Sequence, residues 1–232
     1  MVATKTEPEN VRESVVLVAT RLFAASGFDG TSLQDIADGV GVTKPAVLHY
    51  FPSKEHVRAA VLDGIVAHWN DTLPKLLLAA TRSSGRFDAV LGEVYRFFAD
   101  EPDRARVVLR EALDRPNDLK KVIRGPLRTW LRAVADYIRI GQEAGTHFDD
   151  VDAEAYVIHV LQLVVTATAS FSVMGGLLDE PKKESPKGPA SPSARKRYDR
   201  ELQRIARMAL FAPPGERPKS REPKSERKNG KG

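Results

Sequence analysis

The spacing of apolar residues is the feature that most restricts the fold of this chain. From residue 11 onward they recur at intervals of three and four, which is the repeat of an amphipathic helix. The first such stripe ends before Gly27 and consists of Val11, Val15, Val18, Ala19, Leu22 and Phe23. No run alternates apolar and polar residues between turn signals, as a half-buried strand would require. The pattern therefore predicts an all-α protein.

Helix breakers divide this pattern into two predicted domains. Residues 10–55 are expected to form a three-helix domain, with short helices near 33–40 and around Val47. Residues 56–212 are expected to form a larger helical domain, in which Pro74 must bend or end the first helix. Further helices are predicted over 87–98, 105–113, 126–144, 152–174 and 195–212. The whole chain should contain about nine helices.

Residues 155–178 carry no charged side chain over a length that could cross a bilayer. His159, Gln162 and several Thr and Ser residues lower the transfer free energy of this segment. A helix that is apolar nearly all round lies either in a protein core or at an oligomer interface. We therefore expect a buried helix and no membrane contact.

Composition excludes several classes of protein. The chain contains no cysteine, so disulfides, cysteine-ligated zinc, iron–sulfur clusters and thiol catalysis are excluded. The polar N-terminus has no apolar segment of the signal-peptide kind, and a cytoplasmic location is expected. Residues 1–9 are interpreted as a disordered arm, 179–194 as a flexible Pro-rich linker and 213–232 as a disordered basic tail.

The net charge of +5 does not by itself indicate a nucleic-acid partner. Residues 1–70 contain six Lys and Arg against eight Asp and Glu, whereas residues 213–232 contain seven against three. The basic excess therefore lies outside the predicted N-terminal domain, and function must be argued from local motifs.

The segment from Thr31 to Lys54 has the pattern of a helix-turn-helix. Thr31 to Gln34 is interpreted as a capping box, in which a hydroxyl accepts a backbone amide and Gln34 reaches back. Gly41 can supply the positive φ of a sharp turn. Thr43 then caps a second short helix with Pro45 in its first turn. Ser53 caps the helix that follows.

The inner and outer faces of this motif can be separated by residue size. Ala37 is small where the second helix would cross the first, and the packing positions are filled by Ile36, Val40, Val42, Val47 and Tyr50. The outward face of the second helix then carries Lys44, Pro45, Ala46, Leu48 and His49. A short helix with such a face fits the major groove of DNA. An ordinary helical hairpin is the structural alternative.

These residues resemble the N-terminal domain of the TetR family of bacterial transcription regulators. The resemblance covers residues 10 to about 70 and is carried by LFAASGFDGTSLQDIADGVGVTKPAVLHYFPSKEHV. It includes the Phe-x-x-x-Gly-Phe end of the first helix, the Thr-Ser cap, Gly-Val-Thr-Lys and Tyr-Phe-x-Ser-Lys-Glu. Beyond residue 70 only the number and order of helices are similar.

The resemblance implies a role for each matching position. Thr31, Ser32 and Gln34 would meet a phosphate or the groove edge, and Thr43, Lys44, Pro45 and Ala46 would face bases. His49, Tyr50 and Lys54 would contact the DNA backbone. Leu48 departs from the family pattern, which usually has a DNA-contacting tyrosine there, and offers only apolar contact. Lys44 is the side chain able to donate to guanine O6 and N7.

One motif reads one half-site, so a homodimer on palindromic double-stranded DNA is expected, and the remaining apolar surface of the C-terminal domain is expected to enclose an effector pocket. The last two helices are expected to pair with their copies through Val157, Leu161, Val164, Thr168, Leu202, Ile205 and Ala209. The candidate pocket residues are Tyr95, Phe98, Trp130, Tyr137, His159 and Gln162, because ligand pockets are mostly apolar with a few polar groups. His159 is expected to be buried and hydrogen-bonded.

An enzyme is the main alternative class, and the sequence argues against it. His147, Asp149 and Asp150 form a possible ligand cluster, but a helix cap at Asp149 or Asp150 explains them better. His49 and His56 have no matching carboxylate pair, and no phosphate loop, nucleophile elbow or dinucleotide motif occurs. No cofactor or metal is expected. The predicted function is a dimeric repressor released from its operator by a small, largely apolar molecule, and the alternative is a helical adaptor without specific DNA binding.

Overall fold

The computed structural model of the chain describes residues 8–79, 86–179 and 190–212. These residues contain nine α-helices and one short 3-10 helix, and they form no strand beyond an isolated bridge between His147 and Phe211. The prediction of an all-α fold is confirmed. Residues 1–7 of the expected arm, 180–189 of the expected linker and the expected tail over 213–232 lie outside the described residues.

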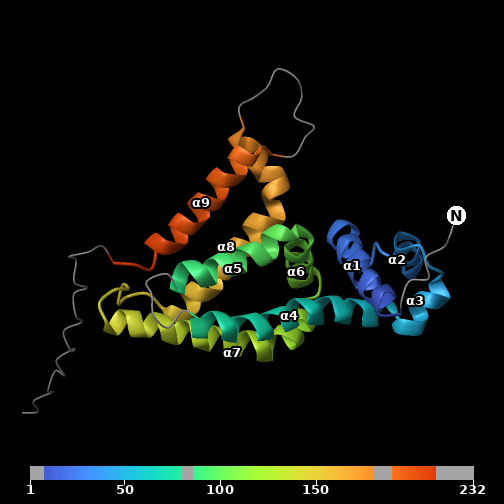
Figure 1. The fold of residues 1–232 in the computed structure, drawn as a ribbon, viewed down its shortest axis with the longest axis horizontal. Coiled ribbons are helices and arrows are strands. Elements are labelled where there is room, and N and C mark those ends of the chain that lie inside the picture. The colour runs from blue at the N-terminus through green and yellow to red at the C-terminus, as the bar shows by residue number, and fades with distance from the viewer. Residues whose placement is uncertain (1–7, 80–85, 180–189, 213–232) are drawn as a thin grey trace, which may run out of the picture.

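The first three helices form a head at one end of an elongated molecule (Figure 1). They are α1 (Pro8–Ser26), α2 (Leu33–Val40) and α3 (Lys44–Tyr50). The helix α1 begins at Pro8, within the segment interpreted as an arm, because proline is well tolerated in the first turn of a helix.

The remaining helices form the body. They are α4 (Lys54–Ala79), α5 (Arg86–Asp100), α6 (Pro102–Asp114), α7 (Pro116–Glu143), α8 (Ala153–Met174), η1 (Gly175–Leu178) and α9 (Pro192–Met208). The long helices α4 and α7 run side by side along the body, and α8 and α9 pack against each other above them (Figure 1). The end of α6 and the start of α7 approach the head.

Prolines do not end the helices where the sequence suggested. The helix α4 continues past Pro74. The helix α7 begins at Pro116, ten residues before the predicted start, and continues through Pro126. An internal proline removes one backbone hydrogen bond, and packing along a long helix can offset that loss. Likewise α9 begins at Pro192, capped by the Ser191 hydroxyl, so residues 192–194 are helical and not part of a linker.

Two apolar cores lie in the described part of the chain, and α6 and α7 contribute buried side chains to both. The head core contains Val15, Ile36, Val47 and Val57, with Leu119 from the start of α7. The body core is built from α5, α6, α7, α8 and α9. The head is therefore packed onto the body through buried side chains and not through a linker alone.

The uncharged segment, residues 155–178, forms nearly all of α8 together with η1. By length and composition alone it could cross a membrane, with a mean hydropathy of 1.8. In the structure α8 packs on α5, α6 and α7. Its inner face is buried and consists of Ala153, Val157, Val164, Val165, Ala167, Thr168 and Ala169. The expectation of a buried helix is met only in part, because 33% of the segment is buried and the outer face of α8 is open.

Candidate nucleic-acid interface

The turn between α2 and α3 has the geometry that its sequence requires. Gly41 has φ 80°, a left-handed conformation that favours glycine, and its amide donates to Ala37 O at 2.9 Å. Thr43 has extended backbone angles, and its hydroxyl accepts from the Ala46 amide at 3.3 Å. Pro45 lies in the first turn of α3, where it needs no amide partner. The start of α3 is therefore fixed by local signals.

One face of α3 is locked into the head core while the other faces solvent. Val47 is fully buried among Ile36 and Ala37, and Val40, Val42 and Tyr50 are packed at the edge of the same core. The exposed face carries Thr43, Lys44, Pro45, Leu48 and His49, and Ala46 is partly exposed at its edge. No hydrogen bond or ion pair holds the Lys44 side chain to another described residue. Lys44 is therefore available to a partner outside the chain.

The start of α2 differs from the predicted capping box. Ser32 is the N-cap, and its hydroxyl accepts from the Asp35 amide at 3.1 Å, while the Ser32 amide donates to the Asp35 carboxylate at 2.7 Å. The backbone hydrogen bond from Ser32 holds the pKa of Asp35 below its usual range. Gln34 instead donates to Asp38.

Thr31 is not placed to touch DNA. Its side chain is buried, and its hydroxyl donates to Gly27 O at 2.9 Å. Ser32 and Gln34 remain exposed at the start of α2. The cap therefore starts one residue later than predicted, because Thr31 turns inward to hold the end of α1.

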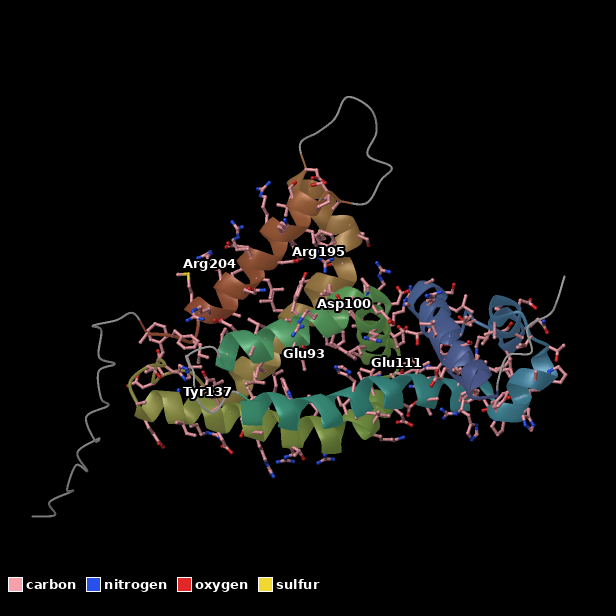
Figure 2. All side chains as sticks on the ribbon, viewed as in Figure 1. Glu93, Asp100, Glu111, Tyr137, Arg195 and Arg204 are labelled. Atoms are coloured by element: carbon pink, nitrogen blue, oxygen red, sulfur yellow. The ribbon has the colours of Figure 1, made fainter. Side chains whose placement is uncertain are left out.

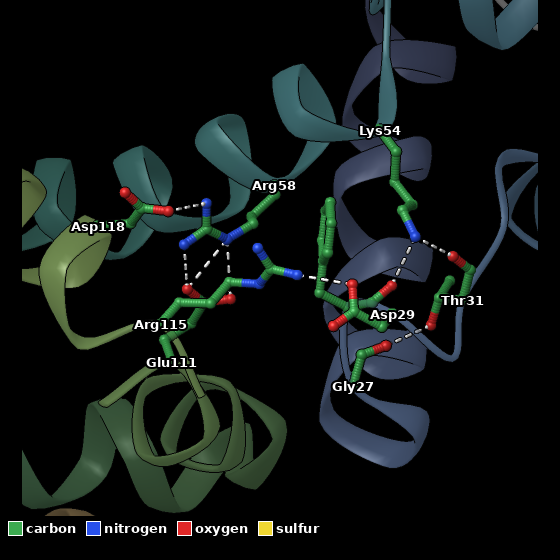
Figure 3. Close-up of polar contacts among 9 residues, drawn as sticks. Gly27, Asp29, Thr31, Lys54, Arg58, Glu111, Arg115 and Asp118 are labelled. Carbon is green, nitrogen blue, oxygen red and sulfur yellow. Dashed lines mark hydrogen bonds and ion pairs between the residues drawn. The ribbon is translucent and has the colours of Figure 1, made fainter. Parts of the chain in front are cut away.

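Lys54 has a structural role that the sequence did not suggest. Its ammonium group donates to Phe28 O at 2.8 Å and to Thr31 O at 2.7 Å, and it lies 4.2 Å from the Phe28 ring centroid (Figure 3). Two of its three donors are thus used within the chain. Lys54 fixes the loop between α1 and α2 and so sets the position of α2.

A buried ion pair joins the start of α4 to α6 beside this loop. Arg58 of α4 donates through Nε to both carboxylate oxygens of Glu111 on α6, at 2.9 and 3.0 Å, and its Nη2 also bonds Glu111 (Figure 3). Asp118 at the start of α7 lies 3.5 Å from the same guanidinium. The hydrogen bond from Arg58 to Glu111 raises the pKa of Arg58. The side chains of Arg58 and Glu111 are only 13% and 8% exposed.

Two further arginines of the body hold the end of α1. Arg110 donates to Ala24 O and Ala25 O, both at 3.0 Å, at the negative end of the helix dipole. Arg115 bonds Asp29 at 2.6 Å and covers the Phe28 ring. These arginines were missed because their partners are 85 or 86 residues away along the chain. Nothing in the local sequence marks such a pair.

A cavity of about 50 Å³ lies in the body between α5, α7 and α8. Its lining residues are Phe87, Val90, Leu91, Val94, Trp130, Val134, Tyr137, Ile138, Tyr156, Val157, Val160 and Leu161. Figure 2 shows Tyr137 toward the end of the body far from the head and Glu111 at the end nearest to it. The cavity therefore lies away from the head, and α7, which lines the cavity, also reaches the head core.

The predicted pocket residues divide into three groups. Trp130 and Tyr137 line the cavity. Tyr95 and Phe98 are buried in the adjoining core, where Tyr95 donates to Asp199 and burial raises its pKa. His159 and Gln162 are exposed, because the cavity lies on the opposite face of α8. The prediction that His159 is buried is wrong.

His147 is the buried histidine of the described residues. Its side chain is almost fully covered, and its Nδ1 lies 3.0 Å from Ile138 O. The described residues contain no group of three His, Cys, Asp or Glu side chains that could hold a metal ion. Asp152, and not Asp149 or Asp150, caps α8 by accepting from the Ala155 amide at 2.9 Å.

Most of the predicted dimer residues face the inside of the protomer. Val157, Val164, Thr168 and Leu202 are buried, and Leu161 lines the cavity. Ile205 and Ala209 are exposed. The outward faces of α8 and α9 are apolar in part and carry Ile158, Ile205 and Met208, which are 43%, 48% and 61% exposed.

Comparison with known proteins confirms the resemblance to the TetR family. Residues 16–61 match the family described as bacterial regulatory proteins, tetR family. The HTH-type transcriptional regulator EthR of Mycolicibacterium smegmatis is 28% identical over 144 residues, which are 61% of this chain and 66% of EthR. The match thus spans slightly less than two thirds of that relative.

Two further proteins match over most of their length. IcaR of Staphylococcus aureus, a biofilm operon icaADBC HTH-type negative transcriptional regulator, is 21% identical over 75% of this chain and 92% of IcaR. The solved structure of the ketosteroid transcriptional regulator KstR2 of Mycobacterium tuberculosis covers 92% of this chain and 98% of its own, with a TM-score of 0.63 at 18% identity. The two relatives are transcriptional regulators and not enzymes, and the solved structure shares the fold.

Proposed function

We propose that this chain, whose residues 16–61 match the tetR family of bacterial regulatory proteins, is a cytoplasmic transcriptional repressor. As a homodimer it binds a palindromic operator in double-stranded DNA, and a small apolar molecule releases it. The observation that carries the proposal is the arrangement of α3. This helix is locked by Val47 into the head core and presents its capped N-terminal end to solvent.

The exposed residues of the motif supply the contacts to DNA. Lys44, Pro45, Ala46 and Leu48 would face base edges in the major groove, with Thr43 at the start of the helix. Ser32, Gln34, His49 and Tyr50 would contact the groove edge and backbone, which sets the register of the head. Lys54 contributes indirectly, because it fixes the loop that positions α2.

A second copy of the chain is needed because one head reads one half-site. The exposed apolar side chains of α8 and α9 supply a surface that two copies could share in a four-helix arrangement. Ile205, which the sequence predicted for this surface, is exposed, and Ile158 and Met208 take the place of the predicted residues that are buried in the protomer. The inner face of α8 is already occupied by the core of the protomer.

Release of the protein from DNA by a ligand follows from the connection between the cavity and the head. A ligand shifts the molecule only if it binds the DNA-incompatible arrangement better than the compatible one. The cavity-lining helix α7 also contributes Leu119 to the head core, so a displacement of α7 reaches the head. The description of IcaR as a negative regulator supports repression as the sign of regulation.

The test is fluorescence anisotropy with labelled DNA from the region upstream of the chain's own gene. Lys44→Ala should weaken specific binding by about 1–3 kcal/mol and relax the preference for the matching base. Lys196→Ala removes the same charge from the exposed side of α9 and serves as the control. Equal binding by both variants would show that α3 does not read the DNA.

A helical adaptor remains the second candidate function. It is favoured by Leu48, an apolar side chain 38% exposed at the position where a DNA-contacting tyrosine was expected. The excess of acidic over basic residues in residues 1–70 also favours the adaptor. Absence of any specific complex with DNA, at low salt and without ligand, would decide for the adaptor.

A further inference from the structure

The body cavity is lined by aliphatic and aromatic side chains only. No Asp, Glu, Lys, Arg or His is among its lining residues. The polar groups of the cavity are those of Trp130, Tyr137 and Tyr156. Burial raises the pKa of Tyr156, so its phenol is neutral, and it donates to Ala206 O. The walls therefore offer no charge that could balance an ionised ligand, and such a ligand would lose its hydration without compensation.

One hydrogen-bond donor on a residue that lines this cavity is left without a partner. The indole Nε1 of Trp130 is buried, and among the described residues it is the buried side-chain nitrogen or oxygen that makes no hydrogen bond. The side chain that carries it is 9% exposed and lines the cavity from α7. A buried donor without an acceptor is costly, and an incoming acceptor would remove that cost.

We propose that this cavity binds a neutral, mainly apolar molecule with one carbonyl or ether oxygen that accepts a hydrogen bond from Trp130 Nε1. The inference rests on the proposed effector role of the body and names the chemical class of the effector. Carboxylates, phosphates and ammonium compounds are excluded by the uncharged walls. A cavity of about 50 Å³ is small for a whole effector, so binding must move α5, α7 and α8 apart.

Three probes of similar shape test the proposal on the full chain. They are 4-phenyl-2-butanone, which is neutral with an acceptor, butylbenzene, which has no acceptor, and 4-phenylbutanoate, which is charged. Binding is measured by calorimetry in the absence of DNA. We expect the ketone to bind about tenfold more tightly than the hydrocarbon, and the carboxylate to bind least.

Substitution of Trp130 isolates the hydrogen bond. Trp130→Phe keeps an aromatic ring and removes the donor, so it should abolish the preference for the ketone over the hydrocarbon. Phe87→Leu changes the wall of the same cavity without touching a donor, and it should lower the affinity for ketone and hydrocarbon by the same factor. The preference should then survive in Phe87→Leu and vanish in Trp130→Phe.

Three outcomes would overturn the proposal. They are binding of the carboxylate as tightly as the ketone, an unchanged ketone preference in Trp130→Phe, and no binding by any of the three probes up to their solubility limits. Each outcome is independent of DNA binding, which the anisotropy experiment measures separately. A chain that shifts DNA but fails here keeps the proposed function and loses only the ligand class.

Discussion

Replacing Glu111 with Gln should destabilise the chain far more than a typical ion-pair substitution. The Glu111 and Arg58 side chains are 8% and 13% exposed, and the variant leaves the guanidinium with only Asp118, at 3.5 Å, as a charged partner. Removing one partner of a buried pair costs about 3–5 kcal/mol. Glutamine retains an acceptor, so we expect about 2–3 kcal/mol. For a chain of this size that corresponds to a Tm lower by about 5–10 °C.

The assay is calorimetric unfolding at one fixed protein concentration, because a dimer's Tm depends on concentration. Glu101→Gln is the matched control, since Glu101 and its partner Arg104 are 44% and 30% exposed and should contribute at most about 1 kcal/mol. The double variant Arg58→Met/Glu111→Leu should recover most of the loss, because it leaves no unpaired charge. Melting of Glu111→Gln and Glu101→Gln within about 1 °C of each other would show that burial of the Arg58–Glu111 pair does not raise the cost of losing it.

Three further results are expected. Lys54→Met should lower the Tm and weaken binding to every DNA sequence alike, because the two hydrogen bonds from the ammonium group to the loop carbonyls are lost. An unchanged Tm would show that these two hydrogen bonds are dispensable. Anisotropy across a salt series should give a log–log slope of only about −2 to −4 for the dimer, since Lys54 and Arg58 are engaged within the chain; a slope near −8 would contradict this. Burial raises the pKa of Tyr156, so its contribution to stability is complete below about pH 10 and lost as pH rises toward the folded pKa; melting of Tyr156→Phe should be less sensitive to pH above 10 than the parent chain.

The head was predictable because its signals are local. The positive φ at Gly41, the Thr43 cap and the burial of Val47 each follow from residues within a few positions of one another. The predicted start of α2 was wrong by one residue because Thr31 and Ser32 both carry a hydroxyl that could cap the helix. Thr31 turns inward to donate to Gly27 O at the end of α1, which leaves Ser32 as the cap.

The faces of α8 could not be assigned from the sequence. The helix is apolar nearly all round, so periodicity does not distinguish the side that meets the core from the side left open. The predicted dimer positions Val157, Val164 and Thr168 lie on the core side, and Ile158 and Gln162 lie on the open side. Only the packing of α5, α6 and α7 resolves this choice.

Helix α7 explains why cavity and head cannot move independently. It carries Trp130 at the cavity and Leu119 in the head core, about 16 Å apart along the helix axis. Widening the cavity by displacing a straight α7 must also displace Leu119, and the contact of Arg58 with Asp118 at the start of α7 resists that movement. The alternative is bending near Pro126, which has no amide to complete the helical ladder. Bending there would absorb the displacement before it reached the head. The strength of the coupling therefore depends on the stiffness of the middle of α7 relative to the junction, and not on ligand affinity alone.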